Sequence, residues 1–89
     1  MLSKNELKYI QSLCQKKQRH SEGLFIVEGT KLIDELLRSD FRIKKIYALS
    51  VWASSYKGRN EVETITDIEL EKISTLQTPN QVLAIVEQQ

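Results

Sequence analysis

Hydrophobic and polar positions follow two different periods along the chain, and these periods predict helices that alternate with strands. In the first 15 residues, apolar side chains recur at helical spacing behind the capping-box pair Ser3 and Glu6, which predicts a helix from about Lys4 to Gln15. The segment LFIVE, residues 24–28, is short, β-branched and apolar on both faces. It has the pattern of a strand that is covered on both sides.

The same two periods predict the remaining elements. Helices are predicted over 31–38, capped by Thr30, and after the capping-box pair Thr66 and Glu69. Strands are predicted over 43–49, 62–65 and 81–87. The segment around Trp52 and Tyr56 is predicted to form a short helix or a loop. Strands that alternate with helices predict an α/β fold, here a small α/β/α sandwich with a mixed or largely parallel sheet of about four strands. A chain of 89 residues has room for one domain, which we expect to span residues 1–89.

Several classes of protein are excluded by composition. The single cysteine, Cys14, lies on the apolar stripe of the first helix, where we expect a small buried hydrophobe, and the chain lacks the companion residues of a disulfide framework or a zinc site. No segment has the apolar length of a signal peptide or a membrane span, which predicts a cytoplasmic protein without a membrane partner. The last predicted strand is followed only by Gln88 and Gln89. We therefore expect this domain to be part of a longer protein.

Charge is distributed unevenly although the whole chain has a net charge of only +1. Residues 1–20 carry five basic side chains against Glu6 alone, a net of +4, whereas the remaining residues carry eight bases against eleven acids, a net of −3. The positive potential is therefore local, and it predicts a binding patch for an anionic partner near the N-terminus.

Candidate catalytic and cofactor-binding residues are scarce. His20 is the only histidine, and no acid is placed by the sequence to orient it as a general base. Gly23, Gly29 and Gly58 are too far apart to form a phosphate-binding glycine loop. We predict that these 89 residues contain no catalytic residue, no cofactor-binding residue and no metal ligand.

The basic run is the stronger signal, and it consists of Lys16, Lys17, Arg19 and His20. We expect it to lie in a short connection between the first helix and the first strand, where its side chains can reach a phosphate backbone. The competing interpretation is a solvated helix end, where cations are favourably placed at the negative pole of the helix dipole.

Glu28 and Gly29 end the first strand and are candidates for organising the basic run. A carboxylate at the end of an apolar strand needs a partner, and Arg19 or the amides that open the next helix would supply one. The alternative is that Glu28 simply faces water. The aromatic residues Phe25, Tyr47, Trp52 and Tyr56 are scattered along the sequence, and core packing explains most of them.

The order of these residues resembles the N-terminal substrate-binding domain of the SpoU/TrmH family of RNA ribose 2′-O-methyltransferases. The resemblance runs from about Leu7 to Val86, and its most specific part has the pattern K-x-x-R…GLF-x-VEG-x-KL between Lys16 and Leu32. One segment departs from the family, because TPNQ replaces the usual Thr-Pro-Gln-Gly and places Asn80 and Gln81 where the family has Gln and Gly. The family has a glycine where this chain has Gln81, so the departure concerns any close contact that the backbone makes at this turn. The expected fold is unchanged.

The resemblance implies a fold similar to that of the small ribosomal proteins that bind kink-turns, and an RNA partner, either rRNA or tRNA. It also implies a homodimeric full-length enzyme whose S-adenosylmethionine-binding knot domain would follow Gln89. In the leading hypothesis, RNA is bound by Lys16, Lys17, Arg19, His20 and Lys31, while Glu28 and Gly29 hold the segment in place.

Two other functions remain open at the level of the sequence. The first is a stand-alone RNA-binding module of the kink-turn type, although the helix TKLIDELL lacks the Asn-Glu start that those proteins share. The second is a protein-interaction domain that mediates dimerisation, in which the basic run is only a solvated surface.

Overall fold

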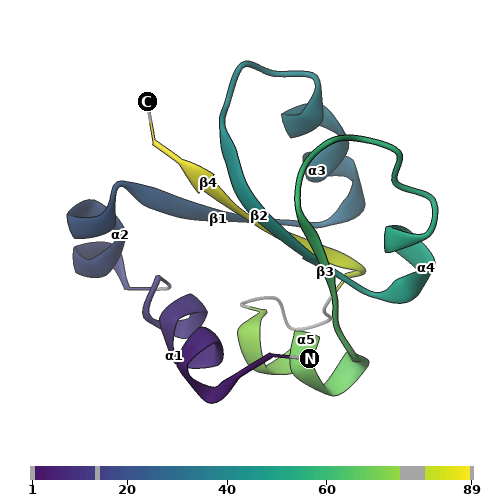
Figure 1. Ribbon diagram of the computed structural model, residues 1–89. Coiled ribbons are helices and arrows are strands. Elements are labelled where there is room, and N and C mark those ends of the chain that lie inside the picture. The colour runs from purple at the N-terminus through teal and green to yellow at the C-terminus, as the bar shows by residue number, and fades with distance from the viewer. Residues whose placement is uncertain (1, 14, 75–79, 89) are drawn as a thin grey trace.

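The chain forms a four-stranded sheet with helices on both faces (Figure 1). This computed structural model describes residues 2–13, 15–74 and 80–88. The elements in order are α1 (Lys4–Ser12), α2 (Lys16–Glu22), β1 (Leu24–Glu28), α3 (Thr30–Leu37), β2 (Ile43–Ala48), α4 (Ser50–Ala53), β3 (Val62–Thr64), α5 (Asp67–Ile73) and β4 (Val82–Glu87). The α/β/α sandwich predicted from the sequence is therefore confirmed.

The sheet has the strand order β1-β4-β2-β3 and is mixed. β4 is antiparallel to β1 on one side and to β2 on the other, whereas β2 and β3 are parallel. The last strand in the sequence thus lies in the middle of the sheet, and β1 and β2 both start at the end of the sheet where β4 finishes.

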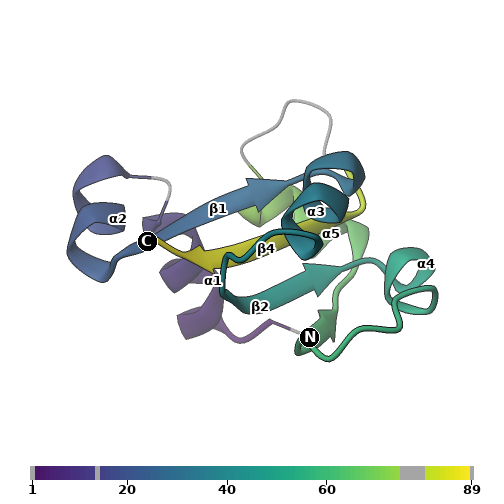
Figure 2. The same cartoon turned by 90° about the horizontal axis from the view of Figure 1, so that it is seen from above.

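Alternate residues of β4 face two separate hydrophobic cores. Leu83 and Ile85 join the core under α1 and α5, whereas Val82, Ala84 and Val86 join the core under α3 and α4. All five side chains are buried. Figures 1 and 2 show the two helical layers on opposite faces of the sheet. No helix in the described part of the chain combines the length and apolar character needed to span a bilayer.

The first helix ends before its predicted end at Gln15, and a second helix that the sequence did not predict follows it. α1 ends at Ser12, Leu13 forms a turn, and α2 begins at Lys16. Leu13 is completely buried, and its carbonyl accepts a hydrogen bond from the Arg19 side chain at 3.3 Å. The interruption lets Leu13 enter the core while the chain turns toward β1.

Other element boundaries agree with the sequence to within about a residue, but some caps differ. Gly29, not Thr30, is the N-cap of α3. The short helix predicted around Trp52 and Tyr56 is present as α4, but it ends at Ala53 and does not include Tyr56. The capping box of Thr66 and Glu69 is confirmed in full. Cys14 lies outside the described residues, so its predicted burial stays a prediction.

The Ser3–Glu6 capping box forms only by half, because Glu6 binds elsewhere. Ser3 Oγ accepts the Glu6 amide, but the Glu6 carboxylate accepts hydrogen bonds from Lys45 Nζ at 2.8 Å and from the Tyr47 hydroxyl at 2.9 Å. Lys45 also pairs with Glu63 at 2.8 Å and with Glu61 at 3.3 Å. This lysine cluster, formed by Glu6, Lys45, Tyr47, Glu61 and Glu63, joins α1 to β2, β3 and the segment before β3.

Protonation equilibria in the lysine cluster are shifted in the directions that favour the ion pairs. Burial alone would lower the pKa of Lys45, but hydrogen bonds to Glu6 and Glu63 outweigh it and raise this pKa well above its ordinary value. The hydrogen bond from Lys45 lowers the pKa of Glu6. Burial and the hydrogen bond to Glu6 raise the pKa of Tyr47. The folded state therefore holds Lys45 charged, Glu6 charged and Tyr47 neutral.

Replacing Lys45 with alanine should lower the free energy of unfolding by about 2 kcal/mol, because Glu6 and Glu63 would then face each other without their shared cation. Lys44→Ala is the matched control, since Lys44 is exposed and lies over the Tyr9 ring at 5.3 Å. It should cost less than about 1 kcal/mol. Urea unfolding of both variants measures the difference, and equal costs would show that the cluster does not contribute specifically to stability.

The raised pKa values of Lys45 and Tyr47 predict a loss of stability at alkaline pH. Above about pH 10, the unfolded chain releases these two protons while the folded chain retains them, so the free energy of unfolding falls as the pH rises. The lowered pKa of Glu6 acts in the opposite direction, and its contribution is lost as the pH falls below about 4.5. Urea titrations across this range should show a smaller alkaline loss in Tyr47→Phe, and an unchanged loss would contradict the role of Tyr47.

Candidate nucleic-acid interface

The predicted basic run forms helix α2, not the short connection expected from the sequence. α2 contains no buried residue. Lys16, Lys17 and His20 are exposed and lie at spacings that place them on one side of the helix. Figure 2 shows α2 at the start of β1, beyond the end of the sheet. The structure thus presents three of the predicted side chains together toward solvent.

Arg19 has a different position, because it is half-buried and bonds to the chain itself. Its Nη1 donates to the Leu13 carbonyl, and its own carbonyl accepts the amide of Gly23, which ends α2 in a left-handed conformation. The carbonyl of Gly23 in turn accepts the amide of Gln88 after β4. Gly23 therefore joins the end of α2 to the end of β4, while Arg19 joins α2 to the turn after α1, and we assign Arg19 a positioning role.

Lys31 lies apart from the other predicted RNA-binding residues. α2 precedes β1 and α3 follows it, so the two helices meet opposite ends of this strand (Figure 2). Five residues of strand span about 16 Å. Lys31 is exposed on the first turn of α3, but the structure does not bring it into one patch with Lys16 and Lys17.

Glu28 has a partner that the sequence did not predict. Its carboxylate accepts a hydrogen bond from the hydroxyl of Ser74, the C-cap residue of α5. Glu28 is the last residue of β1, whereas Arg19 lies on α2, which precedes the opposite end of this strand. Glu28 therefore ties the end of β1 to the end of α5, and its predicted pairing with Arg19 is replaced by this contact.

Gly29 meets the segment in which the sequence departs from the family pattern. Its backbone has φ +102° and ψ 144°, and its amide donates to the carbonyl of Val82. A side-chain carbon at Gly29 would lie 3.9 Å from Nδ2 of Asn80. The glycine of VEG and the asparagine of TPNQ thus lie together at the end of the sheet opposite α2, whereas Thr78 and Pro79 lie outside the described residues.

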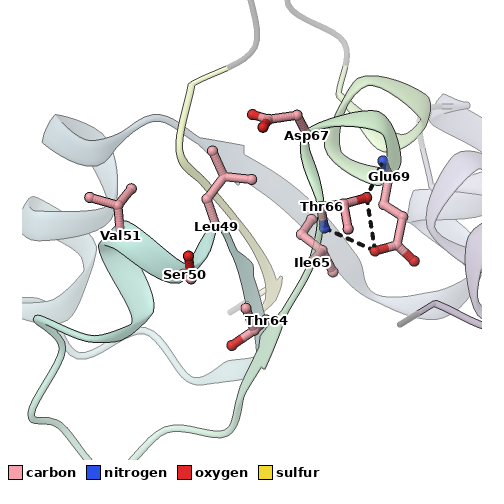
Figure 3. A pocket seen from close by; sticks show the side chains of 8 residues that line it. All are labelled: Leu49, Ser50, Val51, Thr64, Ile65, Thr66, Asp67 and Glu69. Carbon is pink, nitrogen blue, oxygen red and sulfur yellow. Dashed lines mark hydrogen bonds between the residues drawn. The ribbon is translucent and has the colours of Figure 1, made fainter.

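A hollow at this opposite end does not suit a phosphate. It has a volume of about 540 Å³ and is lined by Leu49, Ser50, Val51, Thr64, Ile65, Thr66, Asp67 and Glu69 (Figure 3). None of these side chains is basic, and two are carboxylates. Figure 3 also shows Glu69 turned back toward Thr66, where the capping box occupies the amides that open α5.

Sequence analysis missed basic residues that the fold brings to the α2 end of the sheet. The carbonyl of Arg42 accepts the amide of Glu87, and Glu87 is the partner of Leu24 in the register of β1 and β4. Arg42 and Lys44 are both exposed. The run of bases in RIKK, residues 42–45, was a signal in the sequence, but its proximity to α2 depends on β4 lying between β1 and β2.

Within the described ranges, no group of histidine, cysteine or carboxylate side chains is arranged to hold a metal ion. The described residues likewise form no glycine-lined phosphate loop. The side chains on this surface are cations and hydrogen-bond donors, and both can contact the phosphate oxygens of an anionic polymer.

Comparison with known proteins gives a consistent set of relatives. The profile of the MRM3-like substrate binding domain matches residues 4–84. A TrmH-family protein from Porphyromonas gingivalis is 31% identical with a TM-score of 0.84, and the match covers 98% of this chain and 36% of that one. An AdoMet-bound rRNA methyltransferase from Sinorhizobium meliloti is 27% identical with a TM-score of 0.79, covering 100% of this chain and 35% of that one.

A third structure extends the likeness at the level of the fold alone. The SpoU methyltransferase AviRb from Streptomyces viridochromogenes, in complex with AdoMet, is 21% identical with a TM-score of 0.82, and the match covers 98% of this chain and 36% of that one. The chain thus spans about a third of the length of these solved relatives. Comparison with the sequences of curated proteins gave no match.

The conformation of Gly29 predicts that its replacement by alanine lowers the free energy of unfolding by about 1–3 kcal/mol, because the backbone is in a region that L-residues avoid. Gly23, with φ +67°, is the control, since asparagine tolerates that left-handed region. Thermal unfolding should show that Gly23→Asn is tolerated and Gly29→Asn is not. Equal tolerance at both positions would contradict the proposed constraint at the end of β1.

Proposed function

The chain belongs to the family of MRM3-like substrate-binding domains, and from this premise we propose that it recognises RNA for an S-adenosylmethionine-dependent methyltransferase of the SpoU/TrmH type. A separate domain carries the cofactor and the chemistry. This division of labour is supported by the length of the solved relatives, of which the chain spans about a third.

We extend the proposal to the finer features that the sequence resemblance implies. The reaction is methyl transfer to a ribose 2′-hydroxyl of rRNA or tRNA, in a cytoplasmic enzyme that is a homodimer at full length. The S. meliloti relative is described as an rRNA methyltransferase, which supports rRNA as the substrate.

The exposed basic side of α2 is the observation that carries the proposal. A helix that buries none of its residues contributes little to the core, yet Arg19 and Gly23 hold it in a fixed place at the start of β1. Its surface presents Lys16, Lys17 and His20, all of which can donate to phosphate oxygens. The arrangement suits a rigid grip on an RNA backbone.

Such a grip contributes to catalysis by orientation. Phosphate contacts set the register and direction of the nucleic acid without reading its sequence. Because α2 is fixed to the sheet, an RNA bound there has one orientation relative to a tethered catalytic domain. Correct orientation of reactants supplies several kcal/mol toward a reaction without any chemical group from the binding domain.

The salt dependence of RNA binding tests this proposal. If Lys16 and Lys17 both contact phosphates, the logarithm of affinity for single-stranded RNA should fall with the logarithm of salt concentration at a slope of about −1.4, from about 0.7 per contact. Fluorescence anisotropy with the 89-residue chain measures this slope. The Lys16→Ala/Lys17→Ala variant should bind more weakly and show a flatter slope.

Lys57→Ala/Arg59→Ala is the matched control, because it removes the same charge from exposed residues in the segment before β3, at the other edge of the sheet. This control should retain the slope of the unmodified chain. If the α2 variant binds RNA as tightly as the unmodified chain at low salt, α2 is only a solvated surface helix, and a protein-interaction domain becomes the better description.

A further inference from the structure

An exposed aromatic ring lies at the same end of the sheet as the basic residues. Phe41, in the segment between α3 and β2, is 42% exposed. Its ring packs edge to face against Phe25 of β1, with ring centroids 5.8 Å apart. Phe25 is half-buried and packs against the core under α3 and α4. The outer ring is thus anchored to the core through the inner one.

The backbone that carries Phe41 is also fixed. Ser39 Oγ donates to the carbonyl of Leu36 at 2.6 Å and accepts the amide of Phe41 at 3.2 Å. These two hydrogen bonds join the segment to the last turn of α3. A ring held in this way loses little conformational entropy when a flat ligand stacks on it.

The ring borders a small apolar groove. The groove has a volume of about 310 Å³, and its lining includes Phe25, Leu32, Leu36 and Phe41. Glu35 and Ser39 supply its polar groups. Among the described residues that line the groove, Leu32 and Phe41 are the only large apolar side chains that are exposed. Two such side chains are few for the core of a stable protein interface, which buries about 20–30 residues on each side.

The positive charge near the ring favours a ligand that is part of an anionic polymer. The segment RSDFRIK, residues 38–44, carries three bases and one acid, a net of +2. Asp40 and Arg42 are the direct neighbours of Phe41, and Arg38 lies three residues before it. Both arginines are exposed. A nucleotide combines the two features that this surface offers to a ligand, because its base stacks on an aromatic ring and its phosphate binds a cation.

The aromatic ring and α2 lie at the same end of the sheet. Arg42 is hydrogen-bonded to Glu87, Glu87 pairs with Leu24, and Leu24 follows α2 and Gly23 directly. β1 and β2 are the two neighbours of β4, so their starts are separated by two strand spacings, about 10 Å. An RNA of a few nucleotides spans this separation.

We propose that Phe41, supported by Phe25, stacks against an unpaired base of the RNA whose backbone is gripped by α2. The inference rests on the proposed function, and it specifies the class of substrate as RNA with an unpaired nucleotide near the contacted phosphates. A continuous duplex keeps its bases stacked on one another and offers no free face to the ring.

The test compares two RNAs that differ only in one unpaired nucleotide. A short RNA duplex is prepared with and without a single unpaired 2-aminopurine, and anisotropy measures the affinity of the 89-residue chain for each. The chain should bind the RNA with the unpaired base more tightly and should quench its 2-aminopurine fluorescence. Phe41→Ala should weaken binding of this RNA about fivefold and abolish the quenching.

Variants with different side chains at position 41 separate stacking from packing. Phe41→Tyr keeps an aromatic face and should retain both the preference and the quenching, whereas Phe41→Leu keeps apolar contact with Phe25 and should lose both. The salt dependence should be the same in all three variants, because no charge is removed. Ile68→Ala is the matched control, since Ile68 is another exposed apolar residue, 65% exposed, on α5.

The outcomes distinguish this inference from the proposed function. If Phe41→Leu and Phe41→Ala bind both RNAs as the unmodified chain does, while Lys16→Ala/Lys17→Ala weakens binding, the grip by α2 stands and stacking at Phe41 is refuted. If Phe41→Ala instead dissociates a dimer in sedimentation experiments without changing RNA affinity, the groove is a protein interface and the inference is wrong. If the unmodified chain binds neither RNA at low salt, the proposed function fails and the inference fails with it.

Discussion

The central place of β4 is the constraint on which the rest of the structure depends. β4 is hydrogen-bonded to β1 on one side and to β2 on the other, and its side chains enter both hydrophobic cores. β1 has no other strand partner in the described sheet. Because α2 leads into β1 and Arg42 precedes β2, the position of β4 also sets how far the basic helix lies from the aromatic segment. One strand therefore determines both the stability of the domain and the geometry of its charged end.

The two ends of the sheet have different roles. One end contains Gly29, which belongs to the pattern by which the family is recognised, and Asn80 beside it. At this end the bond between Glu28 and Ser74 joins β1 to the end of α5. The opposite end presents the bases of α2 together with Arg42. The family pattern thus includes residues at both ends of the sheet, because Lys16 and Arg19 lie on α2 whereas Glu28 and Gly29 lie at the other end of β1. Arg42, which the fold brings to the α2 end, lies outside this pattern.

Local patterns in the sequence were sufficient for most of the fold. The strand LFIVE, the capping box at Thr66 and the strand that ends at Glu87 all appear where their periodicity placed them. The end of α1 at Ser12 could not be predicted, because no proline or glycine marks it and the buried Leu13 continues the apolar stripe of Ile10. The recruitment of Glu6 by Lys45 and the contact of Phe25 with Phe41 were equally hidden, since each depends on residues that are distant in the sequence. The separation of Lys31 from α2, in contrast, follows from the predicted strand 24–28 that lies between them.

The shallow attachment of α2 has a consequence for how the domain opens. Elements that bury little apolar surface unfold locally at a free-energy cost far below that of global unfolding, while central strands exchange their amide hydrogens only when the whole domain opens. α2 buries none of its residues, so its amides belong to the fast-exchanging class and those of β4 to the slow one. A polyanion that bridges successive side chains of α2 would suppress this local opening. Because Gly23 is hydrogen-bonded to Gln88, such local opening leaves the place of α2 at the start of β1 unchanged.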